Sequence, residues 1–165
     1  MPILDIHTLE FFSRSPDQTR RVGIRLGGLL KIGDVICLQG NLGAGKTTFV
    51  QGLAQGWGSM DPVSSPTFIL VNIYRRADES QLFHLDAYRI DSVPEAEELD
   101  LDTMLIQGPL IIEWPERIGN LVPVEHLRVS FEYMAEEHRQ MVLRSIGKHY
   151  DALVNHMRRD LFGAS

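Results

Sequence analysis

Cysteine is almost absent from this chain: Cys37 is the single cysteine among 165 residues, so no disulfide can form within it. Such a composition is typical of a protein from a reducing compartment. Basic residues are also few, with 16 Lys and Arg against 22 Asp and Glu, which gives a formal net charge of −6. This balance argues against a general polyanion binder, which usually carries a net basic field, but it does not exclude a local basic patch.

Long apolar runs are missing as well. Stretches such as 104–112 are short and interrupted by Gln, Gly and Pro, whereas a membrane-spanning helix needs about 20 apolar residues. Residues 1–12 contain Asp5 and Glu10 and lack the basic start and apolar core of a signal peptide. We therefore expect a cytoplasmic protein with no membrane partner. Because no repeat, low-complexity tract or linker interrupts the chain, a single domain over residues 1–165 is expected.

Hydrophobic periodicity predicts an α/β domain with a mixed parallel and antiparallel sheet flanked by helices. The expected helices are 17–30, 46–57, 95–105 and 150–162, and the expected strands are 35–38, 68–74, 81–85, 110–112, 127–133 and 140–146. Ser15 is expected to cap the first helix, with Pro16 as its first residue. The turn at 77–80 predicts a β-hairpin, so part of the sheet is antiparallel.

The most specific signal is segment 40–47, Gly-Asn-Leu-Gly-Ala-Gly-Lys-Thr, which matches the phosphate-loop pattern G-x-x-x-x-G-K-[ST] completely. Its glycines let backbone N–H groups surround phosphates, and the following helix adds the positive end of its dipole. Lys46 can reach the β- and γ-phosphates, and the Thr47 hydroxyl can ligate Mg²⁺. The residues expected to bind the nucleotide here are Gly40, Asn41, Leu42, Gly43, Ala44, Gly45, Lys46, Thr47 and Thr48.

The context of this segment favours a nucleotide site over its alternative, a Gly-rich turn with a chance lysine. A predicted strand precedes it and a predicted helix follows it, as the chemistry of a P-loop NTPase fold requires. The guanine-specifying N-K-x-D pattern is absent from the sequence. ATP is therefore the expected nucleotide.

A P-loop enzyme also needs a carboxylate at the end of a neighbouring strand, where it holds Mg²⁺ or orients the attacking water. Glu113 follows the continuous apolar run 110–112, which is typical of a central parallel strand buried on both faces. Asp86 is the second candidate, although it follows a strand that alternates in polarity and is therefore expected to be less central. His84 is interpreted as a structural hydrogen-bonding residue rather than a metal ligand. The residues alone leave the choice between the two acids open.

Two features near these motifs have two explanations each. Segment 63–67, Val-Ser-Ser-Pro-Thr, follows the predicted phosphate-loop helix, where many P-loop proteins place a switch loop that senses the γ-phosphate. A Ser/Pro turn that forms its own hydrogen bonds explains this segment equally well. Trp114, beside Glu113, packs either at the site or in the core.

Four motifs occur in order along the chain. They are segments 40–48, 65–68 (Ser-Pro-Thr-Phe), 84–89 (His-Leu-Asp-Ala-Tyr-Arg) and 113–115 (Glu-Trp-Pro). Together they closely resemble the TsaE (YjeE) family, small bacterial ATPases needed for threonylcarbamoyladenosine (t6A) modification of tRNA. The resemblance covers roughly residues 15–146, and the ordered combination with His-x-Asp-x-Tyr-Arg makes it specific.

The resemblance implies an ATP hydrolase that works with TsaD and TsaB and is weak without them. TsaD transfers the threonylcarbamoyl group to adenosine 37 of tRNAs that read codons beginning with A, so tRNA is met only through the complex. The resemblance further implies that Thr47 and Glu113 ligate Mg²⁺ and that Asp86 serves hydrolysis near the metal. With the lysine of the phosphate loop, the expected catalytic residues are Lys46, Asp86 and Glu113.

Three more residues receive a role only by resemblance. Thr67 lies in the switch-like loop, Thr19 matches a threonine of the family's first helix near the nucleotide, and Arg139 matches an arginine near the nucleotide.

A small-metabolite kinase is the main alternative, because such enzymes also use a phosphate loop in a chain of this size. A kinase is expected to carry an Arg-rich lid, whereas Arg75 and Arg76 lie in the predicted hairpin. A binding module that does not hydrolyse its nucleotide is a third class. The joint presence of Lys46, Thr47 and Glu113 speaks against it.

Overall fold

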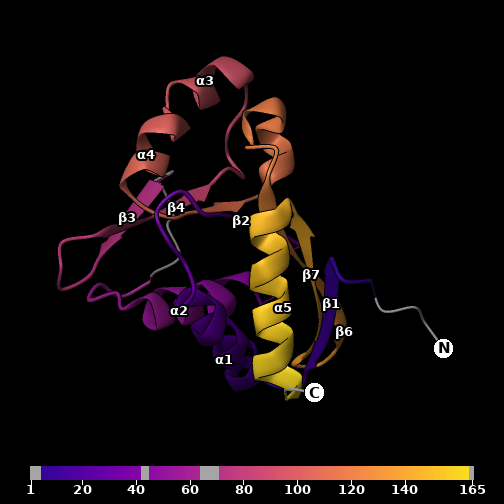
Figure 1. The fold of residues 1–165 in the computed structure, drawn as a ribbon. Coiled ribbons are helices and arrows are strands. Elements are labelled where there is room, and N and C mark those ends of the chain that lie inside the picture. The colour runs from indigo at the N-terminus through magenta and orange to yellow at the C-terminus, as the bar shows by residue number, and fades with distance from the viewer. Residues whose placement is uncertain (1–4, 42–44, 64–70, 164–165) are drawn as a thin grey trace.

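A seven-stranded mixed sheet organises the computed structural model, which describes residues 5–41, 45–63 and 71–163 (Figure 1). Its strands are β1 (Thr8–Ser13), β2 (Val35–Gln39), β3 (Val71–Arg75), β4 (Gln81–Asp86), β5 (Leu110–Glu113), β6 (His126–Ala135) and β7 (His138–Ile146). Its helices are α1 (Pro16–Gly27), α2 (Lys46–Trp57), α3 (Val93–Glu97), α4 (Leu101–Gln107) and α5 (Lys148–Phe162), with short 3₁₀ helices at Pro115–Arg117 and Gly119–Leu121.

The strand order β1-β7-β6-β2-β5-β4-β3 places β2 at the centre of the sheet. The strands β6, β2, β5 and β4 are parallel to their neighbours in this group, while β1, β7 and β3 pair antiparallel. In this register Glu113 lies opposite Leu38 on one side and Asp86 on the other. The carboxyl ends of β2, β5 and β4 therefore meet at one edge, where α/β sheets bind their ligands.

Two hydrophobic clusters cover the two faces of the central strands. Helices α1, α2 and α5 pack on one face of the sheet, together with Ile36 and Leu38 of β2, and helices α3 and α4 lie toward the other face, with Val35 and Cys37 (Figure 1). Because side chains of a strand alternate between faces, β2 contributes to both cores and is buried on both sides. This arrangement explains why its sequence is a continuous apolar run.

Glycines let α1 and α2 approach each other closely. A Cβ atom added at Gly27 would lie 2.1 Å from the Leu53 carbonyl oxygen, and one added at Gly56 would lie 1.9 Å from the Ile24 carbonyl oxygen. Real Cβ atoms essentially never make contacts this short, so these positions accept only glycine at the present helix spacing. The contact fixes α2, whose first residue is Lys46, against α1.

Most predicted elements are confirmed. Helix α2 has the predicted limits, and β3 and β4 form the predicted antiparallel hairpin. The first helix begins at Pro16, and its N-cap Ser15 accepts a hydrogen bond from the Gln18 amide at 3.2 Å. It ends at Gly27 rather than at residue 30.

Other predictions were wrong or lie outside the described residues. The helix expected at 95–105 is two short helices, α3 and α4, because Asp100 between them has φ = 53°, a left-handed conformation that interrupts a helix. Strand β1 was not predicted. Residues 68–70 of the expected strand 68–74 lie outside the described part of the chain. Within that part, no helix has the length and apolar character needed to cross a membrane.

Candidate nucleotide-binding site

The phosphate-loop segment connects the central strand β2 to α2. Gly40 has φ = 149° and Gly45, the N-cap of α2, has φ = 101°, values that L side chains adopt rarely. Because the N-cap is a glycine, no N-cap side chain occupies the first amide groups of α2. These amides and the helix dipole form a ready site for an anion.

Lys46 lies buried at the start of α2, with only 5% of its surface exposed. Its Nζ donates a hydrogen bond to the Gly40 carbonyl oxygen at 2.8 Å and lies 3.7 Å from the centroid of the Trp114 ring. Burial lowers the pKa of Lys46, while the negative charges of Glu113 and Asp86 oppose this shift. Trp114 therefore contacts the lysine of the phosphate loop and also packs against the second hydrophobic cluster, so both explanations apply to it.

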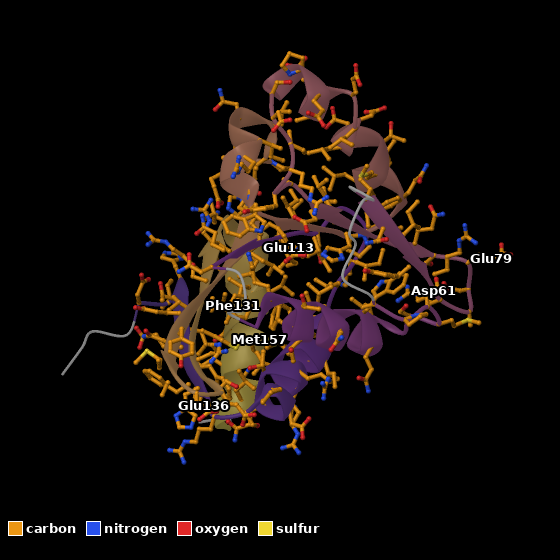
Figure 2. All side chains as sticks on the ribbon, turned by 180° about the vertical axis from the view of Figure 1, so that it is seen from behind. Asp61, Glu79, Glu113, Phe131, Glu136 and Met157 are labelled. Atoms are coloured by element: carbon orange, nitrogen blue, oxygen red, sulfur yellow. The ribbon has the colours of Figure 1, made fainter. Side chains whose placement is uncertain are left out.

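Glu113 ends β5 and is buried, with 7% of its surface exposed (Figure 2). The predicted burial of its strand on both faces is confirmed, since all four residues of β5 are buried. Its Oε2 atom lies 2.6 Å from the Nε2 atom of His84, and the Nδ1 atom of His84 lies 2.9 Å from the Tyr74 hydroxyl. The prediction that His84 is a hydrogen-bonding residue is thus confirmed, but the sequence did not show its partners.

Asp86 ends β4, one strand further from β2 than Glu113, and its side chain is partly buried. Its Oδ1 accepts a hydrogen bond from the Tyr88 amide at 3.0 Å. The Tyr88 ring lies 4.9 Å from the Trp114 ring, and the Arg117 guanidinium lies 5.4 Å from the centroid of Tyr88. An aromatic pair therefore lies beside the acidic end of the sheet.

Thr19 and Arg139 are far apart in the sequence, but their side chains both lie near Gly45. A Cβ atom placed on Gly45 would lie 3.9 Å from Cγ of Arg139 and 4.0 Å from Cγ2 of Thr19. The Thr19 hydroxyl lies 2.6 Å from the Ser13 hydroxyl, and the Arg139 guanidinium lies 4.9 Å from the Tyr133 ring centroid. Both residues therefore flank the end of the phosphate loop, and Ser13 is a neighbour that sequence reasoning missed.

Other expected site residues are less well placed by the structure. Leu42, Gly43, Ala44 and Thr67 lie outside the described residues. Asn41 and Thr47 are exposed and Thr48 is half-buried. Among the described residues, no three His, Cys, Asp or Glu side chains form a ready-made metal cluster.

A glycine-rich loop that joins a central parallel strand to a helix beginning with Lys-Thr, with acids at the ends of the next two parallel strands on one side, defines a P-loop nucleotide-binding protein. Comparison with known proteins narrows this class. The family described as "Threonylcarbamoyl adenosine biosynthesis protein TsaE" matches residues 13–141. The chain belongs to the TsaE family, a family of P-loop ATPases associated with t6A biosynthesis.

Curated relatives and a solved structure agree with this assignment. The "tRNA threonylcarbamoyladenosine biosynthesis protein TsaE" of Bacillus subtilis is 33% identical over 152 residues, which cover 92% of this chain and 94% of the relative. The protein of the same name from Nostoc sp. is 40% identical over 136 residues, covering 79% and 82%. The crystal structure of YdiB from Bacillus subtilis superposes with a TM-score of 0.77 at 28% identity, covering 93% and 95%.

Proposed function

We propose that this protein is a Mg²⁺-dependent ATP hydrolase that acts with TsaD and TsaB and promotes turnover of the complex that forms t6A at adenosine 37 of tRNA. One observation carries this proposal. Glu113 and Asp86 occupy paired positions at the ends of adjacent parallel strands, next to β2, the strand that leads into the phosphate loop. Family membership supports ATP as the nucleotide and t6A biosynthesis as the pathway.

In this proposal the phosphates of ATP bind the N-terminus of α2. The backbone amides that follow Gly45 donate to phosphate oxygens, and Lys46 leaves the Gly40 carbonyl for the β- and γ-phosphates. Thr19 and Arg139, whose side chains both lie close to Gly45, contact the nucleotide. Exchanging the Gly40 carbonyl for phosphate replaces one charge-assisted hydrogen bond of Lys46 by stronger contacts to an anion.

The residues present suit a magnesium ion. The Thr47 hydroxyl and the Glu113 carboxylate are hard oxygen donors. Thr47 lies at the start of α2, which follows β2, and Glu113 ends β5, the parallel neighbour of β2. The bound ion neutralises charge that develops on the phosphates. Asp86, at the paired position on β4, orients the attacking water.

A low rate without partners fits the environment of Lys46. Its ammonium is already engaged by the Gly40 carbonyl and the Trp114 ring, so the contacts must break before it reaches a phosphate. A partner that binds the phosphate-engaged arrangement more tightly shifts this balance.

The kinase alternative lacks its lid among the described residues. Arg76 stacks on Trp57 at 4.6 Å and donates to the Trp57 carbonyl at 3.1 Å. Trp57 is the last residue of α2, at the opposite end from Lys46. Figure 2 likewise shows Asp61 and Glu79, near this hairpin, at the margin of the molecule, away from the central Glu113.

The test is incubation of the full chain with ATP and Mg²⁺, with and without TsaD and TsaB. Release of free phosphate that rises with the partners, and that Glu113→Gln abolishes, supports the proposal. A phosphorylated small acceptor supports the kinase instead. Nucleotide binding with no turnover under either condition supports the binding module and refutes hydrolysis.

A further inference from the structure

A line of hydrogen bonds crosses three adjacent strands and ends on Glu113. The Tyr74 hydroxyl of β3 lies 2.9 Å from Nδ1 of His84 on β4, and Nε2 of His84 lies 2.6 Å from Oε2 of Glu113 on β5. The three residues are 3%, 2% and 7% exposed, so bulk water competes little for these bonds. A buried polar chain of this kind is strong when every group is paired.

The donor and the acceptor of each of these hydrogen bonds follow from the carboxylate of Glu113. An ionised carboxylate only accepts hydrogen bonds, so Nε2 of His84 carries the hydrogen that Glu113 receives. In a neutral imidazole the other nitrogen, Nδ1, is then an acceptor, and it receives the hydrogen of the Tyr74 hydroxyl. With Glu113 ionised and His84 neutral, the hydrogen bonds therefore run in one direction, from Tyr74 through His84 to Glu113, and select the Nε2–H tautomer of His84.

We propose that His84 and Tyr74 are positioning residues for hydrolysis, which hold Oε2 of Glu113 and thereby aim Oε1 at Mg²⁺ or at a water bound to it. The inference rests on the proposed role of Glu113. A glutamate side chain has several rotatable bonds, whereas Mg²⁺ demands near-ideal octahedral geometry. When the hydrogen bond fixes Oε2, fewer positions remain open to Oε1. Outer partners that orient a ligand in this way typically contribute about 10- to 100-fold to metal affinity or activity.

The placement of the two residues fits a positioning role better than a purely structural one. The face of the sheet that carries His84 has apolar residues nearby, with Leu82 and Ile111 buried in the same cluster as Tyr74. An imidazole in such surroundings costs free energy unless both nitrogens are paired, and an apolar residue would fill the space at less cost. His84 pairs one of its two nitrogens with the candidate metal ligand itself.

The test uses substitutions that separate the hydrogen bond from packing. His84→Gln keeps an N–H donor at the reach of Nε2, while His84→Met keeps the bulk and removes the donor. Tyr74→Phe removes only the hydroxyl. The control is Tyr150→Phe, since the buried Tyr150 hydroxyl accepts from the Val35 amide at 2.9 Å, at the other end of β2.

Two measurements apply, and neither needs turnover. The first is the affinity of the full chain for Mn²⁺ in the presence of a non-hydrolysable ATP analogue, followed by electron paramagnetic resonance. We expect His84→Met to weaken Mn²⁺ binding by about 10- to 100-fold, Tyr74→Phe to weaken it less, and His84→Gln and Tyr150→Phe to stay near the parent. The second is the nitrogen NMR spectrum of labelled His84, which should show the Nε2–H tautomer.

Each outcome decides between the inference and the proposed function. If Glu113→Gln loses Mn²⁺ affinity but His84→Met keeps the parental affinity, the inference is overturned and the proposed function stands. Unchanged affinity in Glu113→Gln overturns the proposed metal role and the inference with it. If His84→Met does not fold, Tyr74→Phe and the tautomer decide: parental Mn²⁺ affinity in Tyr74→Phe, or an Nδ1–H imidazole, overturns the inference.

Discussion

Replacing Lys46 by Met should separate nucleotide binding from the stability of the empty protein. Methionine keeps most of the buried stem of the side chain and removes the ammonium. In the empty protein this loses the bond to the Gly40 carbonyl and the stacking on Trp114. It also removes the cost of burying a charge, the cost that lowers the pKa of Lys46. These effects oppose each other, so the unfolding free energy should change little.

The loss in ATP binding is offset only in part, because the variant no longer has to break the contacts of Lys46 with the Gly40 carbonyl and Trp114. A hydrogen bond to a charged group contributes about 1.5–3 kcal/mol, and a change of about 1.4 kcal/mol corresponds to a tenfold change in Kd. Lys46→Met should therefore weaken ATP binding by roughly 10- to 150-fold. In the empty protein, the lost hydrogen bond to the Gly40 carbonyl, about 1.5–3 kcal/mol, and the lost cation–π contact, about 0.5–2 kcal/mol, stand against the relieved cost of burying the ammonium, roughly several kcal/mol. We expect a net change within about 1 kcal/mol.

Thermal unfolding with and without Mg²⁺ and ATP measures both quantities in one experiment. At a ligand concentration of about 100 times the parental Kd, ATP stabilises the parent by about 2.7 kcal/mol. For a chain of this size each kcal/mol shifts Tm by about 2–4 °C. Lys46→Met should lose about half of this shift or more, while Lys148→Met, at an exposed lysine that begins α5, should keep it. An ATP-induced shift of parental size in Lys46→Met would refute the assignment of the phosphate site.

Three further predictions follow from the described contacts. Asp86→Asn should retain ATP binding and slow phosphate release, on the order of 10²-fold or more for loss of a positioned base, and a parental rate would exclude Asp86 from the reaction. Gly27→Ala should lower the unfolding free energy by about 1–3 kcal/mol because of overpacking, whereas Gly28→Ala, where the nearest atoms to a new Cβ lie 3.7 Å away, should be neutral or stabilising; urea titrations showing equal effects would contradict the packing of α1 on α2. Burial raises the pKa of Cys37 to about 12, so a thiol reagent at pH 8 should modify it only as fast as the protein unfolds, and rapid labelling of the native protein would contradict its burial.

The local parts of the site could be predicted from sequence because each is encoded within a few neighbouring residues. The phosphate loop needs glycines at fixed spacing between a strand and a helix, and the predicted limits of that helix, 46–57, are those of α2. Glu113 follows an apolar run. Such a run is typical of a strand that is buried on both faces, because every one of its side chains then lies in a core. The Ser15 cap is equally local.

The parts that could not be predicted depend on contacts between distant segments. Strand β1 is defined by its pairing with β7, where Leu9 lies opposite Leu143. The residues around β1 in the sequence do not identify this distant partner. The bond from His84 to Glu113 spans 29 residues. The break in the helix expected at 95–105 depends on Asp100 adopting a left-handed conformation, which single-residue propensities do not specify.

We propose that hydrolysis at Glu113 returns the modification complex to its active form. The amount of t6A formed per complex measures this directly. TsaD, TsaB, substrate tRNA and a threonylcarbamoyl donor are combined with ATP and either the parent or Glu113→Gln, at ATP concentrations that saturate both. We expect the concentration of t6A to exceed that of the complex with the parent, and to stop at or below that of the complex with Glu113→Gln. Equal, repeated turnover with the two proteins would contradict the claim.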